Sequence, residues 1–276
     1  MNDNAATHVA PTPALPAVLA LAQRELVRFF RQRNRVFGAL GQPIIFWLLF
    51  SEGLRSNELG YAHFFPGTLV MILLFTAIFA TISIIEDRSE GFLQSVLVSP
   101  APRWAMVLGK VLGGSAIAMI QGLLFLGLGA ATLGLASGLD DVAAAIALMA
   151  VISVALTALG FSIAWRMDST HGFHAIMSVF LFPMWLLSGA FFPATGDGWL
   201  AWIVRLNPLT YGVAGLRRYL QFADSASRVV SDPGAAPAVD ALPTLGLCWW
   251  VTLAFAAAML AVAWKVAGTR TAGDLR

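Results

Sequence analysis

"FFPGTLVMILLFTAIFATISII", residues 64–85, contains no Asp, Glu, Lys or Arg. A helix of about 20 apolar residues is long enough to cross the hydrocarbon core of a bilayer. The rest of the chain has the same character, because 58% of its 276 residues are hydrophobic and only 12% are charged. Soluble domains contain about 25% charged residues. The sequence therefore predicts an all-α integral membrane protein.

Further apolar runs lie on both sides of this stretch. Bounded by charged residues, the six predicted spans are 36–51, 64–85, 111–139, 142–165, 172–196 and 241–264. The first is short and contains Gln42-Pro43, which predicts a kink, because proline frees a carbonyl that neighbouring helices must satisfy. Within the spans, most hydroxyl groups are expected to donate to the carbonyl four residues earlier. We expect one six-span domain over 14–276, preceded by a disordered tail at 1–13.

The distribution of charge predicts how these spans are oriented. Most of the 17 basic residues fall on one side of the membrane if residues 1–35 and 86–110 lie in the cytoplasm, as the positive-inside rule requires. Six spans then return the end of the chain to the cytoplasm. No Asp, Glu, Lys or Arg lies inside the predicted spans, which argues against ion-driven transport. His171 and His174 are expected near the start of the fifth span, at its cytoplasmic edge.

Residues 14–35 differ from the spans, because they combine apolar and basic residues with helical spacing. Two helical sides are expected, one with Leu19, Leu26, Phe29 and Phe30 and the other with Arg24, Arg28, Arg31 and Arg35. A basic amphipathic helix of this kind lies in the headgroup plane of a membrane. The alternative is a positively charged flank that only fixes topology. The pattern alone does not choose between them.

The predicted second and third spans are separated by "EDRSEGFLQSVLVSPAPRWAMVLGK", residues 86–110. A helix over 90–99 is predicted here, capped by Asp87 or Ser89, with prolines ending it. Its apolar face is expected to comprise Phe92, Leu93, Val96 and Leu97. Such a helix can rest on lipid, or it can dock into a groove of a soluble partner. Both interpretations remain open at this stage.

Several classes of function lack the residues that they need. A nucleotide-binding P-loop requires Gly-x-x-x-x-Gly-Lys-Ser/Thr, but Lys110 precedes Val111 and Lys265 follows Trp264. The sequence Asp168-Ser169-Thr170-His171 is interpreted as a polar turn, because adjacency in sequence is not the geometry of a catalytic triad. No cluster has metal-ligand spacing, and a net charge of +2 does not indicate nucleic-acid binding. We expect neither an enzyme nor a cofactor on this chain.

Two patches resemble one known family, the type-2 ABC exporter permeases, such as daunorubicin and nodulation-factor export subunits. The first patch is Glu-x-x-x-x-Gly-Phe-Leu-x-x-x-Leu-Val-Ser-Pro from residue 86, followed by Arg103 and Leu108-Gly109-Lys110. The second, residues 186–220, resembles the family's Ser-Gly-x-x-Phe-Pro, Asn-Pro-Leu-Thr-Tyr and Leu-Arg pattern. One position departs from the resemblance, since many members have Thr where this chain has Phe92.

The resemblance implies a permease subunit of the bacterial inner membrane that forms a homodimer and is driven by a separate ABC ATPase, which binds ATP and Mg²⁺. The 90–99 helix would be the coupling helix and 14–35 the connecting helix beside it. The implied ATPase interface consists of Glu86, Arg88, Glu90, Gly91, Phe92, Leu93, Val96, Leu97, Ser99, Pro100 and Arg103.

The resemblance also implies an external re-entrant hairpin within residues 190–240, before the last span. Its motif residues are Ser188, Gly189, Phe192, Pro193, Asn207, Pro208, Leu209, Thr210, Tyr211 and Arg217. Export and an amphiphilic cargo, such as a drug, a lipid or a lipid-linked glycan, are what the family and the apolar spans suggest. A secondary transporter that works without an ATPase is the alternative, and an intramembrane enzyme or structural membrane protein is a third class.

Overall fold

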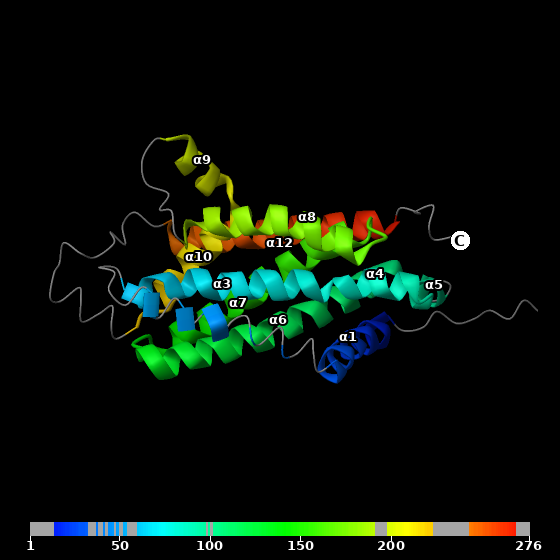
Figure 1. The fold of residues 1–276 in the computed structure, drawn as a ribbon, viewed down its shortest axis with the longest axis horizontal. Helices are drawn as coiled ribbons and strands as arrows, with labels where there is room; N and C mark the ends of the chain where they lie inside the picture. The colour runs from blue at the N-terminus through cyan, green and yellow to red at the C-terminus, as the bar shows by residue number, and fades with distance from the viewer. Residues whose placement is uncertain are drawn as a thin grey trace, which may run out of the picture.

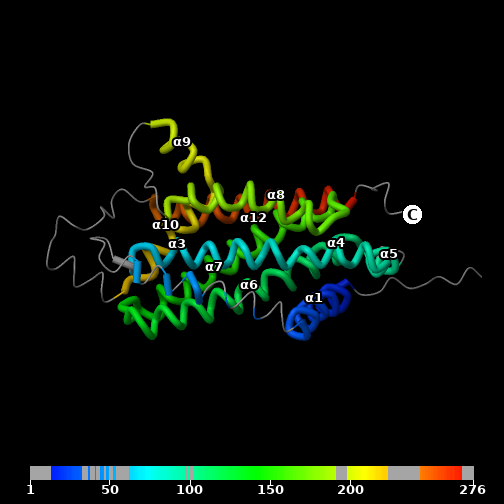
Figure 2. The backbone as a smooth tube through the Cα atoms, viewed as in Figure 1, coloured from blue at the N-terminus to red at the C-terminus, as the bar shows by residue number. Residues whose placement is uncertain are grey.

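The computed structural model describes residues 14–32, 37, 41, 44–46, 48–49, 52–53, 60–97, 99, 102–190, 198–222 and 243–268. The long helices of this part of the chain run side by side in one elongated bundle (Figure 1). Five of them are long and apolar enough to cross a membrane. The tube view shows how the chain passes back and forth between the two ends of the bundle (Figure 2). The protein is therefore built as a multi-pass membrane protein.

The first described span consists of α3 (Gly60–Ala80) and α4 (Ile82–Ser89), which continue into each other at Thr81. The others are α6 (Arg103–Leu133), α7 (Leu139–Ala164), α8 (Thr170–Trp185) and α12 (Leu245–Gly268). A π-helical turn, η1 (Leu186–Ala190), follows α8. A long apolar helix thus lies at five of the six predicted spans, although the boundaries of α6 differ from those predicted for the span 111–139. Most of the predicted span 36–51 and all of the tail 1–13 lie outside the described residues.

Two predicted boundaries were wrong because both helices extend further into the segment 86–110 than predicted. The helix formed by α3 and α4 continues through charged residues to Ser89, and α6 begins at Arg103 rather than at 111. Asp87 and Lys110, which the sequence placed in a loop, therefore lie within helices, and both are buried. A charged residue does not by itself end a helix or a span, because a buried charge is tolerated when it is paired with an opposite charge.

The core of the bundle is centred on α3, which packs against α6, α7, α8 and α10 (Pro208–Tyr219). Phe65, Leu69 and Leu73 of α3 are completely buried. In contrast, α12 packs on α7 and α10 and leaves Trp250 and Trp264 exposed. Large apolar side chains on the outside are expected for helices that face lipid.

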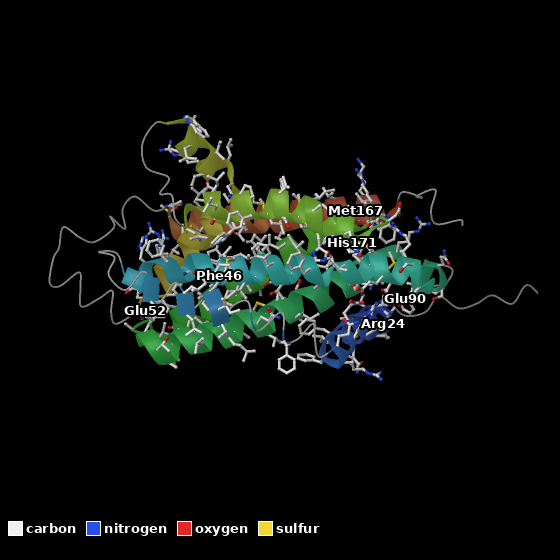
Figure 3. The ribbon with its side chains drawn as sticks, in the orientation of Figure 1. Arg24, Phe46, Glu52, Glu90, Met167 and His171 are labelled. Carbon is white, nitrogen blue, oxygen red and sulfur yellow. The ribbon has the colours of Figure 1, made fainter. Side chains whose placement is uncertain are left out.

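The two ends of the bundle differ in what lies on them. One end has α1 (Ala14–Arg31), which packs against α6, and the short α5 (Phe92–Leu97). Arg24, Glu90, Met167 and His171 all lie toward this end, which we call the charged end (Figure 3). At the opposite end, α9 (Trp199–Leu206) projects from the bundle and α10 packs within it.

Candidate functional site

The turn between α4 and α5 forms the tip of the charged end. Helix α4 ends at Ser89, and Gly91 follows with φ of +76°, a left-handed conformation that glycine adopts without steric cost. The next helix covers only Phe92–Leu97. The prediction that Asp87 or Ser89 caps a helix over 90–99 was wrong, because both residues belong to the preceding helix. Ser89 Oγ instead donates to the carbonyl of Glu86 at 2.8 Å.

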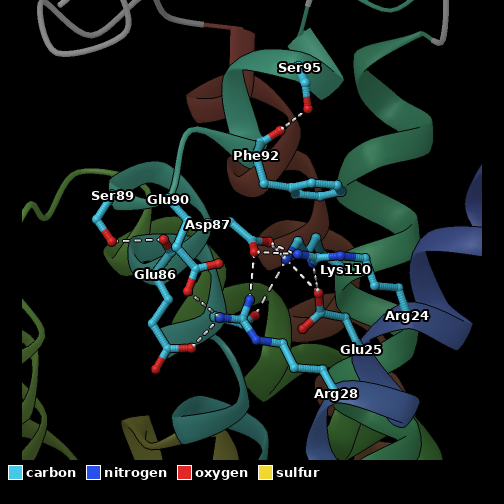
Figure 4. Close-up of polar contacts among 11 residues, drawn as sticks. Arg24, Glu25, Arg28, Glu86, Asp87, Ser89, Glu90, Phe92, Ser95 and Lys110 are labelled. Atoms are coloured by element: carbon cyan, nitrogen blue, oxygen red, sulfur yellow. Dashed lines mark hydrogen bonds and ion pairs between the residues drawn. The ribbon is translucent and has the colours of Figure 1, made fainter.

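The carboxylate of Asp87 is the centre of this end of the bundle (Figure 4). Arg24 donates from both terminal nitrogens to its two oxygens, at 2.8 and 3.0 Å. Arg28 donates to Oδ1 at 2.6 Å, and Lys110 Nζ donates to Oδ2. The side chain of Asp87 is completely buried. One carboxylate thus joins two cations of α1 and one cation of α6 to α4.

Further acids complete the charge balance around Asp87. Lys110 Nζ also donates to Glu25 Oε1 at 2.5 Å, and both side chains are buried. The second terminal nitrogen of Arg28 forms ion pairs with Glu86 at 3.0 Å and Glu90 at 3.2 Å. We call this set the charged junction; its members are Arg24, Glu25, Arg28, Glu86, Asp87, Glu90 and Lys110.

The charged junction has three cations and four acids, and each cation forms an ion pair with at least one acid. Removing one partner of a buried ion pair typically destabilises a protein by about 3–5 kcal/mol, because the other charge stays buried. The sequence pattern alone did not indicate that Glu25, Asp87 and Lys110 are buried. The helical pattern continues after residue 85, which could have indicated that the helix extends past Asp87. The predicted spans were instead ended at the first charged residue.

Phe92 contributes a different contact to the same place. The guanidinium carbon of Arg24 lies 3.6 Å from the centroid of the Phe92 ring, well within the distance of a cation–π interaction. The ring therefore covers the face of the arginine whose nitrogens bind Asp87 (Figure 4). Phe92, the position that departs from the family pattern, thus forms a contact between α5 and α1.

Helix α1 can reach Asp87 because two glycines of α6 let it approach closely. A Cβ added at Gly109 would lie 2.7 Å from Leu21 Cβ, and one at Gly113 would lie 2.7 Å from Glu25 Cβ. Small residues four apart let helix backbones pack closely in membranes. The Gly109-x-x-x-Gly113 spacing is therefore a packing seam within the chain.

The predicted amphipathic helix at 14–35 is confirmed as a helix over Ala14–Arg31. On its basic side, Arg24 and Arg28 turn toward α4 and bind Asp87. Leu19 and Phe30 are exposed while Phe29 is buried. An exposed apolar side next to a packed side suits a helix that lies between bundle and lipid.

Arg88, the neighbour of Asp87, connects the tip to the other side of the bundle. It donates to the carbonyls of Trp165 at 2.5 Å and Met167 at 3.2 Å, and forms an ion pair with Asp168 at 3.1 Å. These acceptors belong to the short connection between α7 and α8. Asp87 and Arg88, which are adjacent in α4, thus contact different parts of the bundle: Asp87 binds α1 and α6, and Arg88 binds the connection between α7 and α8.

The residues predicted for an ATPase interface divide between the surface and the core. Glu90 is exposed, with Ser89 and Ser95 beside it in the tip. Leu93, in contrast, is only 2% exposed and packs in the core, and Val96 packs against it. Arg103 is exposed at the start of α6. Ser99 donates to the carbonyl of Val96 at 2.6 Å, while Pro100 and the side chain of Leu97 lie outside the described residues.

At the opposite end, Asn207 organises the second sequence patch. Its Oδ1 accepts from the backbone nitrogen of Leu209 at 3.0 Å and caps α10, with Pro208 as the first helical residue. Its Nδ2 donates to the carbonyls of Met184 at 2.6 Å and Leu187 at 3.0 Å. Asn207 and Pro208 thus form the turn between the short helices α9 and α10.

Other motif residues support the same turn. Thr210 Oγ1 donates to the carbonyl of Val204 at 2.5 Å, and Tyr211 Oη donates to that of Arg205 at 3.0 Å. Gly189 has φ of +75°, and its carbonyl accepts from Arg217 at 3.4 Å. Burial lowers the pKa of Arg217 to about 10, so it remains a cation at neutral pH.

Not every motif residue has a contact of this kind. Ser188 is completely buried, and its hydroxyl has no hydrogen-bond partner among the described residues. Phe192 and Pro193 lie outside the described residues.

The hydroxyl groups inside the spans mostly behave as predicted. Ser153, Thr157 and Ser162 of α7 each donate to the carbonyl four residues earlier. Contacts between helices are fewer among the described residues. Thr76 of α3 donates to Gln121 of α6 at 2.5 Å, and Ser115 of α6 donates to Thr157 at 3.2 Å. The hydroxyl groups at membrane depth therefore mainly form hydrogen bonds with the backbone of their own helix.

Comparison with known proteins agrees with both patches. Curated proteins named "Putative transport permease ycf38" match the chain, from Porphyra purpurea at 25% identity and from Cyanophora paradoxa and Pyropia yezoensis at 24%. Each match covers 72% of this chain and 72% of the relative. The family model of the ABC-2 type transporter matches residues 16–220, from α1 through α10. The chain belongs to the ABC-2 type transporter family of transport permeases.

Proposed function

We propose that this chain is the membrane subunit of an ABC exporter, in which two copies form the transport path and the α4–α5 tip docks on a separate nucleotide-binding ATPase. The proposal is supported most by the charged junction, which ties the tip to α1 and α6 through side chains. A force applied at the tip would therefore reach several helices at once.

The tip has one exposed side and one anchored side. Ser89, Glu90 and Ser95 face outward, where a soluble partner can reach them. Leu93 and Asp87 face inward and are buried. A docking helix normally inserts its apolar face into its partner, but in this chain the contact would be made by polar residues and the turn. The apolar face of α5 instead transmits movement to the bundle.

The two sides of the tip would move together when the ATPase closes. Asp87 connects to α1 and α6, whereas Arg88 connects to the α7–α8 turn. Movement of α4 would therefore change the spacing of helices on both sides of α3. Cargo is proposed to be amphiphilic, because the described spans contain few polar contacts at membrane depth.

One observation favours the alternative, a secondary transporter. Glu25 and Asp87 are buried carboxylates in a membrane protein, and such groups often carry protons. Both are paired with Lys110 at the end of the bundle, which suits a structural role better. Proteoliposomes decide between them: an ABC exporter moves cargo with ATP and its ATPase, whereas transport driven by a proton gradient alone would favour the alternative.

The sixth span is proposed at residues 36–51. Helix α1 lies at the charged end, while α3 begins at the opposite end (Figure 1), so the chain between them must cover the length of the bundle. The described positions in this stretch are helical; Ile44, Ile45 and Leu48 are exposed, whereas Phe46 packs against the core. With this span, α1, the tip and the end of α12 would all be cytoplasmic and the α9–α10 hairpin external.

Cysteine labelling tests this orientation in a Cys248→Ala background. A cysteine at Asp140, exposed at the opposite end, should react with an impermeant thiol reagent in intact cells. A cysteine at Ser95 should react only after the membrane is opened. Labelling of the Ser95 position in intact cells would reverse the proposed topology.

Docking is tested by blocking the exposed side of the tip. Ser95→Trp adds a large side chain at an exposed position without removing a contact between helices. If the tip enters a groove, binding to the nucleotide-binding ATPases of the same organism in a co-purification should weaken about fivefold or more, because overpacking costs about 1–3 kcal/mol. Asp140→Trp is the matched control at the opposite end. Equal binding by both variants and the wild type would remove the tip as the docking site.

A further inference from the structure

A groove on the surface of the bundle lies between α6 and α12, near the charged end. Its volume is about 230 Å³, and it is lined by Trp104, Val107, Leu108, Leu260, Ala261 and Trp264. No lining residue has a charged side chain. Sites for compact small molecules usually measure about 300–1,000 Å³, so this groove suits a slender apolar chain better.

The position of the groove fits the boundary between hydrocarbon and headgroups. Its lining residues occupy the first turns of α6 and the last turns of α12. Arg103 Nη1 donates to the carbonyl of Gly268 at 3.1 Å, so the two helix ends meet just beyond it. Trp104 and Trp264 are 43% and 61% exposed, and tryptophan is enriched at this depth of a membrane.

Two cations stand beside the tryptophans. Arg103 precedes Trp104 and Lys265 follows Trp264, and both are exposed. Neither forms an ion pair with an acid in the part of the chain that the structure describes. The cations of the charged junction differ, since Arg24, Arg28 and Lys110 all contact carboxylates. Within the described residues, the two cations next to the open end of the groove therefore have no acidic partner.

We propose that this groove binds one acyl chain of an anionic phospholipid, whose headgroup phosphate lies against Arg103 and Lys265. The chain fills the apolar groove between the tryptophans, and the phosphate supplies the counter-charge that the two cations lack. Basic sites between membrane helices bind anionic headgroups in this way. The proposal requires only that the protein lies in a membrane, and it holds whether or not an ATPase drives the permease.

The test measures lipid binding to the purified subunit by native mass spectrometry, titrating phosphatidylglycerol and, separately, phosphatidylcholine. Phosphatidylglycerol should bind more tightly. Lys265→Gln should weaken phosphatidylglycerol binding about fivefold, and combination with Arg103→Gln about 25-fold, because each cation near a headgroup is worth about fivefold in affinity. Phosphatidylcholine binding should not change. Arg31→Gln and Arg166→Gln are controls, exposed cations of the same end that do not flank the groove.

The apolar half of the proposal is tested by filling the groove. Ala261→Phe should abolish the tight phosphatidylglycerol site, while Ala258→Phe, exposed on the same helix and outside the lining, should not. Thermal unfolding of each variant shows that it is folded. The proposal is overturned if the two control cations matter as much as Lys265 or if Ala261→Phe retains the site. It is equally overturned if Ala261→Phe only separates two copies of the chain, which would make the groove a protein interface.

Discussion

At the charged end of the bundle, three cations from two helices converge on the buried carboxylate of Asp87. At the opposite end, Asn207 instead connects three backbone groups within one stretch of chain, from Met184 to Leu209. The first arrangement joins side chains that are far apart in sequence, such as Arg24 and Asp87. The second satisfies the carbonyls left free where α8 breaks at η1.

The difference indicates what each end can transmit. An ionic junction between helices makes them move together, and it fails as a unit if a single charge is lost. A side chain that satisfies local backbone groups stabilises a turn but does not connect distant helices. The charged end is therefore suited to transmit movement between helices, whereas Asn207 at the opposite end stabilises a local turn of the backbone.

The largest effect is expected from Asp87→Asn. The substitution keeps the size of the side chain but leaves Arg24, Arg28 and Lys110 facing a neutral group, which should lower the free energy of unfolding by about 3–5 kcal/mol. Thermal unfolding in detergent measures it. Hydrogen exchange should speed up in α1 and α5 but not in α10. The control Asp168→Asn removes the charge of a side chain that is 88% exposed and should cost less than about 1 kcal/mol.

A charge-matched variant sharpens the same test. Lys110→Met together with Asp87→Asn removes one cation with the acid, so part of the lost stability should return. If the double variant is no more stable than Asp87→Asn alone, unpaired charge is not what destabilises the junction. If Asp87→Asn resembles Asp168→Asn, the contrast between the two ends is lost.

A smaller and more local effect is expected from Asn207→Ala. It removes the cap of α10, worth about 1 kcal/mol, and leaves two carbonyls without their donor, for a total of about 2–4 kcal/mol. Asn207→Ser should recover only the capping part, because its hydroxyl can cap a helix but is too short to reach both carbonyls. Hydrogen exchange should change in α8 and α10 while α1 stays protected. Faster exchange in α1 would mean that the two ends are not independent.

How well the sequence predicted these regions depended on whether the signal was local. Five of the six predicted spans correspond to helices long and apolar enough to cross a membrane, because the thickness of the bilayer sets how many apolar residues a span needs. The turn at Asn207-Pro208 was also predictable, since both residues favour the start of a helix. The bonds from Asn207 to Met184 and Leu187 were not, because they exist only after α8 breaks in three dimensions.

The charged junction was the least predictable part. Asp87 and Lys110 each look like the end of a span, and only the folded bundle shows that they neutralise each other. The spacing of Gly109 and Gly113 can be read directly in the sequence, but the helix that packs against them cannot, because nothing local in α1 identifies which helix it will contact. Charge balance and close approach are properties of several helices together, so they emerge only at the tertiary level.

The smallest effect concerns Phe92, the residue that connects the tip to the charged junction without carrying a charge. Phe92→Leu keeps an apolar side chain but removes the ring face over Arg24, which should cost about 0.5–2 kcal/mol. Phe92→Tyr keeps the ring and should behave like the wild type. A double-mutant cycle with Arg24→Lys isolates the contact, because lysine retains the charge but cannot stack as a plane. If Phe92→Leu and Phe92→Tyr are equally stable, the ring only fills space, and the charged junction holds α1 by its ion pairs alone.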